Sequence, residues 1–169
     1  MFILFMGPLF QCIGYVILKS IFSNYVELIR EYHVGILLFN MLPIYPLDGG
    51  KLLNILLCYI SPYKKSLTTS ILISYIVILL LVIINIGNIG LNIIIVSVFL
   101  SYKVYREYKD IDYTYERFLL ERYLYNYKYK KSKIIDNKDS FYKDRRHVIK
   151  NENKYLLEKE YLENLFKIS

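Results

Sequence analysis

The sequence predicts an all-α integral membrane protein with about four transmembrane helices and a cytoplasmic tail of mixed, mostly helical structure. Hydrophobic residues make up 55% of the 169 residues, more than the roughly 45–50% that soluble domains carry with glycine included. Charge is also uneven: residues 1–102 hold five basic and three acidic residues, whereas residues 103–169 hold 17 and 12. We therefore expect a membrane-embedded part at residues 1–106 and a basic aqueous tail at residues 107–169.

Long apolar segments define the expected spans, because about 20 apolar residues cross a bilayer. The expected spans are residues 2–22, 34–60, 67–84 and 89–102. We expect a polar loop at 23–33, which can include a short helical turn, and an uncharged turn at 85–88, both on one side of the membrane. Lys64, Lys65 and the basic residues of 103–109 would lie on the other side, which the positive-inside rule makes cytoplasmic. The protein is thus predicted to be a multi-pass protein of the cell membrane.

The second span is interrupted between its two halves. Pro43 and Pro46 stop a continuous helix, Gly49-Gly50 follow, and an apolar helical pattern then resumes. We expect extended or unwound backbone at 41–47. Lipid cannot satisfy free backbone groups, so such a break must be buried in protein or line a watery cavity. The break therefore indicates a site.

Asp48 follows this break and is the one acid between Glu31 and Glu107. An aspartate at the centre of a membrane helix costs about 2.5–3.5 kcal/mol on insertion scales, so an acid kept there usually pairs with a metal, a base or a proton path. Alternatively, Asp48 caps a helix that begins at Gly49, where the helix dipole favours its charge. The two interpretations are compatible, since one carboxylate oxygen can cap while the other binds a metal.

The run Asn-x-x-Pro-x-x-Pro-Leu-Asp-Gly-Gly at 40–50 resembles the second signature of the site-2 proteases, which are membrane-embedded zinc peptidases. This resemblance implies that Asp48 is the third zinc ligand and that Asn40 helps to hold the substrate strand. Met6-Gly7-Pro8-Leu9 resembles the opening of the preceding family helix. The tail, at 116–123 and 141–147, is similar to that of the sporulation-stage branch, whose members trim a membrane-associated precursor of a transcription factor.

The first signature of that family, His-Glu-x-x-His, is absent from these 169 residues. Its histidines bind zinc and its glutamate activates water. We expect His33 to be an interfacial loop residue, and His147 to be solvated or paired with an acid. In the family the missing signature lies upstream of the Gly-Pro helix. We therefore expect a gene start placed at an internal Met, a split gene with a partner fragment, or a decayed remnant, and this chain alone to be inactive.

Two other classes of function compete with the protease. A pseudoprotease or membrane scaffold would bind substrate through the broken helix and Asn40 without metal. A transporter fragment would bind a cation at Asp48, although no second broken helix or repeat supports it. Membrane lipid and a membrane-associated protein substrate are the expected partners.

The basic tail favours retention near anionic lipid, and nothing in it indicates nucleic-acid binding. We expect a helix at 113–127, an irregular basic segment at 128–150 and an amphipathic helix at 153–166, with Asn151 or Asn153 as its cap.

Overall fold

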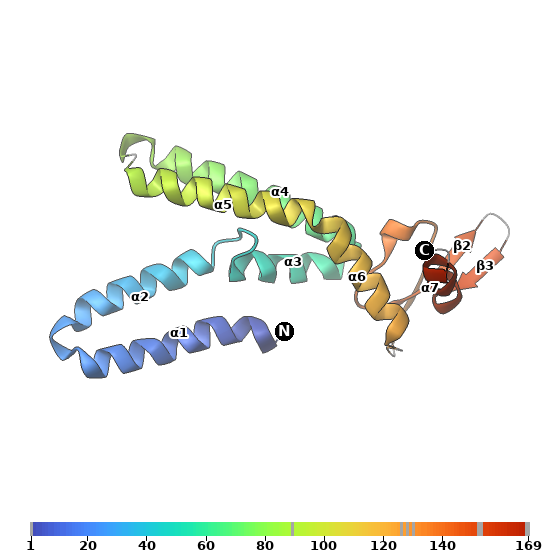
Figure 1. Ribbon diagram of the computed structural model, residues 1–169, viewed down its shortest axis with the longest axis horizontal. Helices are drawn as coiled ribbons and strands as arrows, with labels where there is room; N and C mark the ends of the chain where they lie inside the picture. The colour runs from blue at the N-terminus through green and yellow to red at the C-terminus, as the bar shows by residue number, and fades with distance from the viewer. Residues whose placement is uncertain are drawn as a thin grey trace. The chain divides into compact units, whose positions relative to one another are not determined.

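The computed structural model describes residues 2–88, 90–125, 127, 129, 131–151 and 154–167. In chain order the elements are α1 (Phe2–Ile21), η1 (Ser23–Tyr25), α2 (Val26–Asn40), α3 (Asp48–Ile60), α4 (Tyr63–Ile84), η2 (Ile86–Asn88), α5 (Leu91–Lys109), α6 (Ile111–Leu124), β1 (Ser132–Ile135), η3 (Lys138–Ser140), β2 (Arg146–Asn151), β3 (Lys154–Leu157) and α7 (Glu158–Lys167) (Figure 1). The chain forms two compact units. One contains Met1–Leu53 and Leu72–Val104, and the other contains Asn54–Ile71 and Tyr105–Ser169. The predicted boundary at residue 106 stays a prediction.

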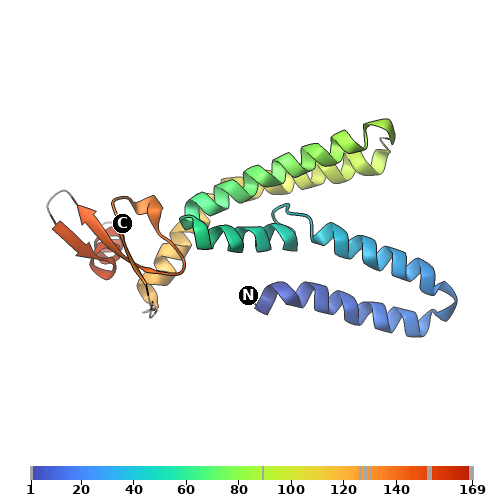
Figure 2. The same ribbon diagram turned by 180° about the vertical axis from the view of Figure 1, so that it is seen from behind.

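In the first unit, α1 and α2 form an antiparallel hairpin that turns through η1 (Figure 2). The predicted loop at 23–33 is therefore wrong, because α2 already begins at Val26. The reason lies in the spacing of its partly buried residues. These are Val26, Ile29, His33, Leu37 and Asn40. These residues recur every three or four positions, as residues on one face of a helix do. The charged residues of the segment, Glu27, Arg30 and Glu31, are exposed and lie on the other side of the same helix.

The break between α2 and α3 is confirmed, since α2 ends at Asn40 and α3 begins at Asp48. Its backbone is turned and not extended, and the reason appears in the loop's own hydrogen bonds, which are described with the site. After α3, the helix α4 leads through the turn η2 into α5, as the sequence predicts for an apolar hairpin.

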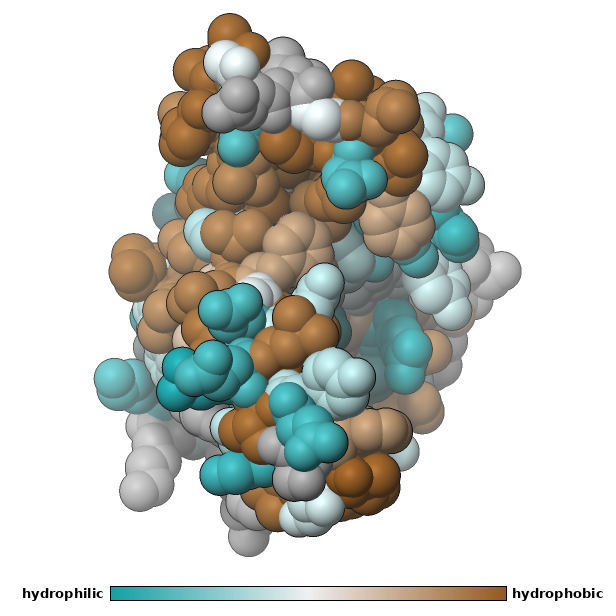
Figure 3. Space-filling model, turned by 90° about the vertical axis from the view of Figure 1, so that its left-hand side faces the viewer, coloured by the Kyte–Doolittle hydropathy of each residue, from teal (hydrophilic) through white to brown (hydrophobic). Residues whose placement is uncertain are grey.

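Among the described helices, α4 is the one that is both long and apolar enough to cross a membrane. Four spans therefore stay a proposal. Large hydrophobic side chains are nevertheless exposed on each long helix of the first unit, including Phe10 at 67%, Leu38 at 62% and Leu91 at 76%. Figure 3 shows such hydrophobic side chains spread over the face that it presents. Patches of this extent mark surfaces that lipid or protein covers.

The tail in the second unit combines two helices with a three-stranded sheet of order β1-β2-β3. Strands β1 and β2 pair in parallel, and β2 and β3 pair antiparallel. Ile135 and Ile149 are partners in the register and are both buried. The core also contains Leu119 of α6, Phe141 of the connection between β1 and β2, and Leu162 of α7.

The tail differs from its prediction in two segments. The region 128–150 contains β1 and most of β2, so the expectation of an irregular segment is wrong. The two strands are short and carry lysine and arginine, and β1 buries only its last residue, so neither shows a clear apolar alternation. The helix predicted at 153–166 begins at Glu158, because residues before it form β3. Asn151 is the last residue of β2 and does not precede a helix, and Asn153 lies outside the described residues.

Candidate functional site

The loop 41–47 satisfies all of its own backbone donors. It contains five N–H groups, since Pro43 and Pro46 have none. Four of them bond to nearby backbone carbonyls, over 2.7–3.2 Å: those of Met41, Leu42, Ile44 and Leu47. The fifth, the N–H of Tyr45, donates to Ser74 Oγ of α4 over 2.7 Å. The loop therefore meets the requirement of an apolar environment that no backbone group be left unpaired, and it does so by folding into turns.

Two glycines allow this loop to fold back over the start of α3. A Cβ atom at Gly49 would collide with the carbonyl oxygens of Met41 and Leu42. A Cβ atom at Gly50 would collide with the backbone of Ile44 and Tyr45. Both glycines are buried. The Gly-Gly pair is therefore required for close approach of the loop to the helix that begins with Asp48.

Asp48 is the first residue of α3, and its side chain is 28% exposed. Its carboxylate forms an ion pair with Lys51 over 3.5 Å. On the other side it faces α1, where a Cβ atom at Gly7 would lie 2.6 Å from Asp48 Oδ2. The helix begins at Asp48 and not at Gly49, and none of the described hydrogen bonds joins this carboxylate to a backbone N–H. The capping role predicted from the sequence is therefore not supported, although a negative charge in the first turn remains favourable.

Asn40 and His33, which the sequence analysis also singled out, make none of their described contacts with Asp48. Asn40 is the last residue of α2 and is partly buried, and no described hydrogen bond joins it to Asp48. His33 lies on α2 and not in a loop. Its ring stacks on Tyr15 of α1 at 4.7 Å between centroids, and its carbonyl accepts a hydrogen bond from Gln11.

Among the described residues, no group of three His, Cys, Asp or Glu side chains could hold a metal ion. A catalytic zinc needs three protein ligands. The part of the chain that the structure describes offers Asp48 as a single candidate ligand, and Cys58, which is buried, bonds within α3 and to Ser66 instead. These residues alone therefore do not fit a zinc centre.

A polar seam in the second unit, which sequence reasoning missed, joins α3 to α4. The buried Asn54 Oδ1 accepts hydrogen bonds from Ser66 Oγ at 2.9 Å and Ser70 Oγ at 3.4 Å. Ser66 Oγ also donates to the Asn54 carbonyl at 3.0 Å. Hydrogen bonds between helices stabilise packing where apolar surface cannot. The four-residue spacing of Ser66, Ser70 and Ser74 within an apolar run was the signal that could have predicted it.

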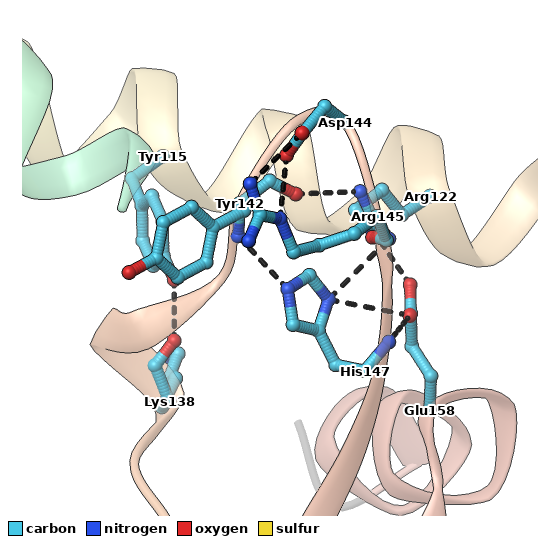
Figure 4. A network of polar contacts seen from close by, with 8 residues as sticks. All are labelled: Tyr115, Arg122, Lys138, Tyr142, Asp144, Arg145, His147 and Glu158. Atoms are coloured by element: carbon cyan, nitrogen blue, oxygen red, sulfur yellow. Dashed lines mark hydrogen bonds and ion pairs between the residues drawn. The ribbon is translucent and has the colours of Figure 1, made fainter. Parts of the chain in front are cut away.

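The tail holds a second polar cluster, centred on His147 of β2 (Figure 4). The carboxylate of Glu158, at the start of α7, accepts from Arg122 Nε over 2.6 Å and from the backbone N–H of His147 over 2.7 Å. Arg122 also donates to the carbonyls of Tyr142 and Arg145. His147 is fully buried, so the prediction that it pairs with an acid is confirmed and the solvated alternative is wrong.

The hydrogen bonds define the tautomer of His147. The N–H of Tyr142 donates to Nε2 over 3.0 Å, so Nε2 carries no proton. Nδ1 therefore bears the hydrogen and faces Glu158 Oε2 at 3.4 Å. Arg122 lies 3.5 Å from the same Nδ1, but two donors cannot bond, so this contact is not a hydrogen bond. The imidazole is neutral.

The pKa values agree with this assignment. Burial lowers the pKa of His147 below its ordinary value, and the guanidinium of Arg122 adds to burial against the opposing effect of Glu158. Burial alone would raise the pKa of Glu158, but hydrogen bonds from His147 and Arg122 outweigh it and hold that pKa at about 2. The cluster fastens α6, β2 and α7 together and leaves none of its groups exposed for chemistry. Beside it, the Tyr115 hydroxyl donates to the Lys138 carbonyl, and burial raises the Tyr115 pKa.

No family model matches the chain. The chain is 37% identical over 99 residues to stage IV sporulation protein FB of Bacillus subtilis (strain 168). The match covers 57% of this chain and 34% of the relative, so the chain spans about a third of the length of the curated protein that it matches. The chain is therefore similar, over more than half of its length, to a bacterial sporulation protein.

Proposed function

We propose that this chain is the carboxyl-terminal part of an intramembrane zinc metalloprotease of the site-2 type that acts in sporulation. The observation that carries the proposal is the break at 41–47. It presents Asp48 at the start of a helix, next to a loop whose backbone donors all have hydrogen-bond partners. The similarity to stage IV sporulation protein FB supports the sporulation role. The substrate class is a membrane-associated regulatory protein, which we take to be a transcription-factor precursor.

Asp48 is proposed as one zinc ligand, with the remaining ligands and the general base supplied from outside these 169 residues. Its position favours this role for two reasons. Its ion pair with Lys51 is at the long end of such contacts, at 3.5 Å, and half of the Lys51 side chain is exposed, so the carboxylate can exchange this partner. On the side that faces α1, the residue next to the carboxylate is Gly7, which has no side chain to cover it.

Asn40 is proposed to hold the substrate. The loop N–H groups already have partners, so the loop cannot donate to a substrate strand as an extended backbone would. A substrate strand would therefore depend on side-chain groups such as the Asn40 amide, which can both donate and accept.

The chain is proposed to be a multi-pass membrane protein with its tail in the cytoplasm. The exposed apolar side chains of α1, α2, α4 and α5 support lipid as the surrounding partner. Basic residues at the start of α4 and the end of α5 support the orientation. We propose no nucleic-acid partner.

The test is an exchange of Asp48 for asparagine in the protein isolated from its native membranes. Asp48→Asn keeps the size of the side chain but removes the charge that a zinc ligand needs. We expect cleavage of a membrane-associated substrate to be abolished while the protein still inserts. Asp112→Asn is the matched control, because Asp112 is a 79% exposed tail carboxylate paired with Lys64. Substantial residual cleavage in Asp48→Asn would refute the ligand assignment.

A non-catalytic pseudoprotease or scaffold is the second candidate. The broken helix and Asn40 would serve such a protein equally, since it needs no metal ligand. It predicts that Asn40→Ala weakens binding of the substrate while Asp48→Asn leaves binding unchanged, and that the natural protein carries no zinc.

A further inference from the structure

We infer that Ser74 of α4 is a positioning residue for Asp48, acting through the loop 41–47. The position that Ser74 gives to Asp48 is argued from the hydrogen bonds of the loop. Its importance for catalysis rests on the proposed function. This role belongs to a helix that the predicted site did not include.

The N–H of Tyr45 is the one loop donor whose described bond goes to a side chain. The other four donors reach backbone carbonyls within four residues, so helix ends and turns provide their partners locally. Tyr45 instead reaches Ser74 Oγ, 29 positions along the chain, at 2.7 Å. This hydrogen bond therefore joins the loop to α4.

Burial makes the Ser74 hydroxyl hard to replace as the partner of the Tyr45 N–H. Ser74 is fully buried, and so is Ile44, the residue before the donating amide. Water therefore cannot readily replace the hydroxyl if it is removed, and an unsatisfied buried N–H is costly. This requirement explains a buried serine at position 74, within the apolar part of α4.

The same peptide contacts the start of α3 on its other side. The backbone of Ile44 and Tyr45 lies so close to Gly50 that no Cβ atom would fit there. The Ile44–Tyr45 peptide is thus held between Ser74 on α4 and Gly50 on α3. Asp48 lies two residues before Gly50, so a loop released from Ser74 would move the carboxylate away from its place beside Gly7.

The neighbouring Ser70 provides a matched control. It lies one turn earlier on the same helix and is also buried, but its hydroxyl bonds to the Ser66 carbonyl at 2.8 Å and to Asn54. Ser70→Ala therefore removes a buried hydroxyl from α4 without releasing Tyr45. A general effect of losing a buried hydroxyl would appear in both variants.

The first experiment measures amide hydrogen exchange at single-residue resolution in the 169-residue chain in detergent micelles. Ser74→Ala should accelerate exchange of the Tyr45 amide by about tenfold or more, because its partner is lost, whereas Ser70→Ala should leave it unchanged. If Ser74→Ala cannot be recovered folded, Ser74→Cys serves in its place. It keeps a weak acceptor and should give a smaller acceleration. Unchanged Tyr45 exchange in the recovered Ser74 variant, or equal acceleration in Ser70→Ala, would overturn the inference.

The second experiment reads the position of Asp48 without metal. A Gly7→Cys/Asp48→Cys pair should form a disulfide, identified by mass spectrometry of the joined peptides, because a Cβ atom at Gly7 lies 3.6 Å from Asp48 Cγ. Adding Ser74→Ala should lower the yield severalfold, and adding Ser70→Ala should not. An undiminished yield with Ser74→Ala contradicts the positioning role. Neither experiment needs zinc, so a natural protein without zinc would refute the proposed function while leaving this inference standing.

Discussion

Replacing Glu158 by glutamine should lower the free energy of unfolding of the tail. The Glu158 side chain is 9% exposed and pairs with Arg122, whose side chain is 2% exposed. Its pKa falls from an ordinary 4.5 to about 2, and each unit is worth about 1.36 kcal/mol, so the charged form contributes about 3 kcal/mol at neutral pH. Breaking a buried ion pair by removing one partner typically costs about 3–5 kcal/mol, because the remaining charge is left unpaired. Both arguments give a loss of about 3 kcal/mol for Glu158→Gln.

The assay is pulse proteolysis of the full chain in micelles across a urea series, following cleavage within the tail. The control is Glu121→Gln on α6, where the carboxylate pairs with Arg117 at 3.2 Å but both side chains are well exposed. An exposed helix pair is worth about 0.3–0.5 kcal/mol, so the control should barely shift the midpoint. A loss below about 1 kcal/mol for Glu158→Gln, or equal losses in the two variants, would show that the buried Glu158–Arg122 ion pair does not stabilise the tail.

Two further predictions concern the loop and the pH dependence of the tail. Gly50→Ala should displace the loop at the start of α3 and destabilise the first unit by more than about 1 kcal/mol, measured by urea denaturation in micelles. Gly87→Ala, where the space is open, should be neutral. Because the pKa of His147 is lowered on folding, the unfolded chain takes up the proton first as pH falls through 6.5. Tail stability should therefore decline as the pH falls below 6.5, and this slope should vanish in His147→Gln. The contribution of Glu158 should be lost only below pH 4.5, towards about 2.

The local features of the break could be predicted from the sequence, because they depend on residues with strong backbone preferences. Pro43 and Pro46 fix where helix is impossible, and α2 and α3 end and begin on either side of them. The hydrogen bond between the loop and α4 could not be predicted, since it joins Tyr45 to Ser74, which is distant in sequence. The sequence of an apolar helix that contains serines does not show whether each hydroxyl bonds to a carbonyl of its own helix or to another element.

The tail was predicted less well for a related reason. Helix α6 has a local periodicity and was expected close to its observed place. Strands β1 and β2 are short and carry lysine and arginine, so their pairing across the loop that contains Phe141 left no pattern in the sequence. His147 was recognised as a possible partner of an acid, but the acid, Glu158, is 11 residues away on α7.

The measurement that tests the central claim most directly is the zinc content of the protein isolated from its native membranes through a carboxyl-terminal tag, so that any preceding or partnering segment is retained. About one zinc per tagged chain is expected, with nearly all of it lost in Asp48→Ala and retained in the Asp112→Asn control. Zinc absent from the natural protein, or present in equal amount in Asp48→Ala, would contradict the proposal that Asp48 is a ligand in an intramembrane metalloprotease.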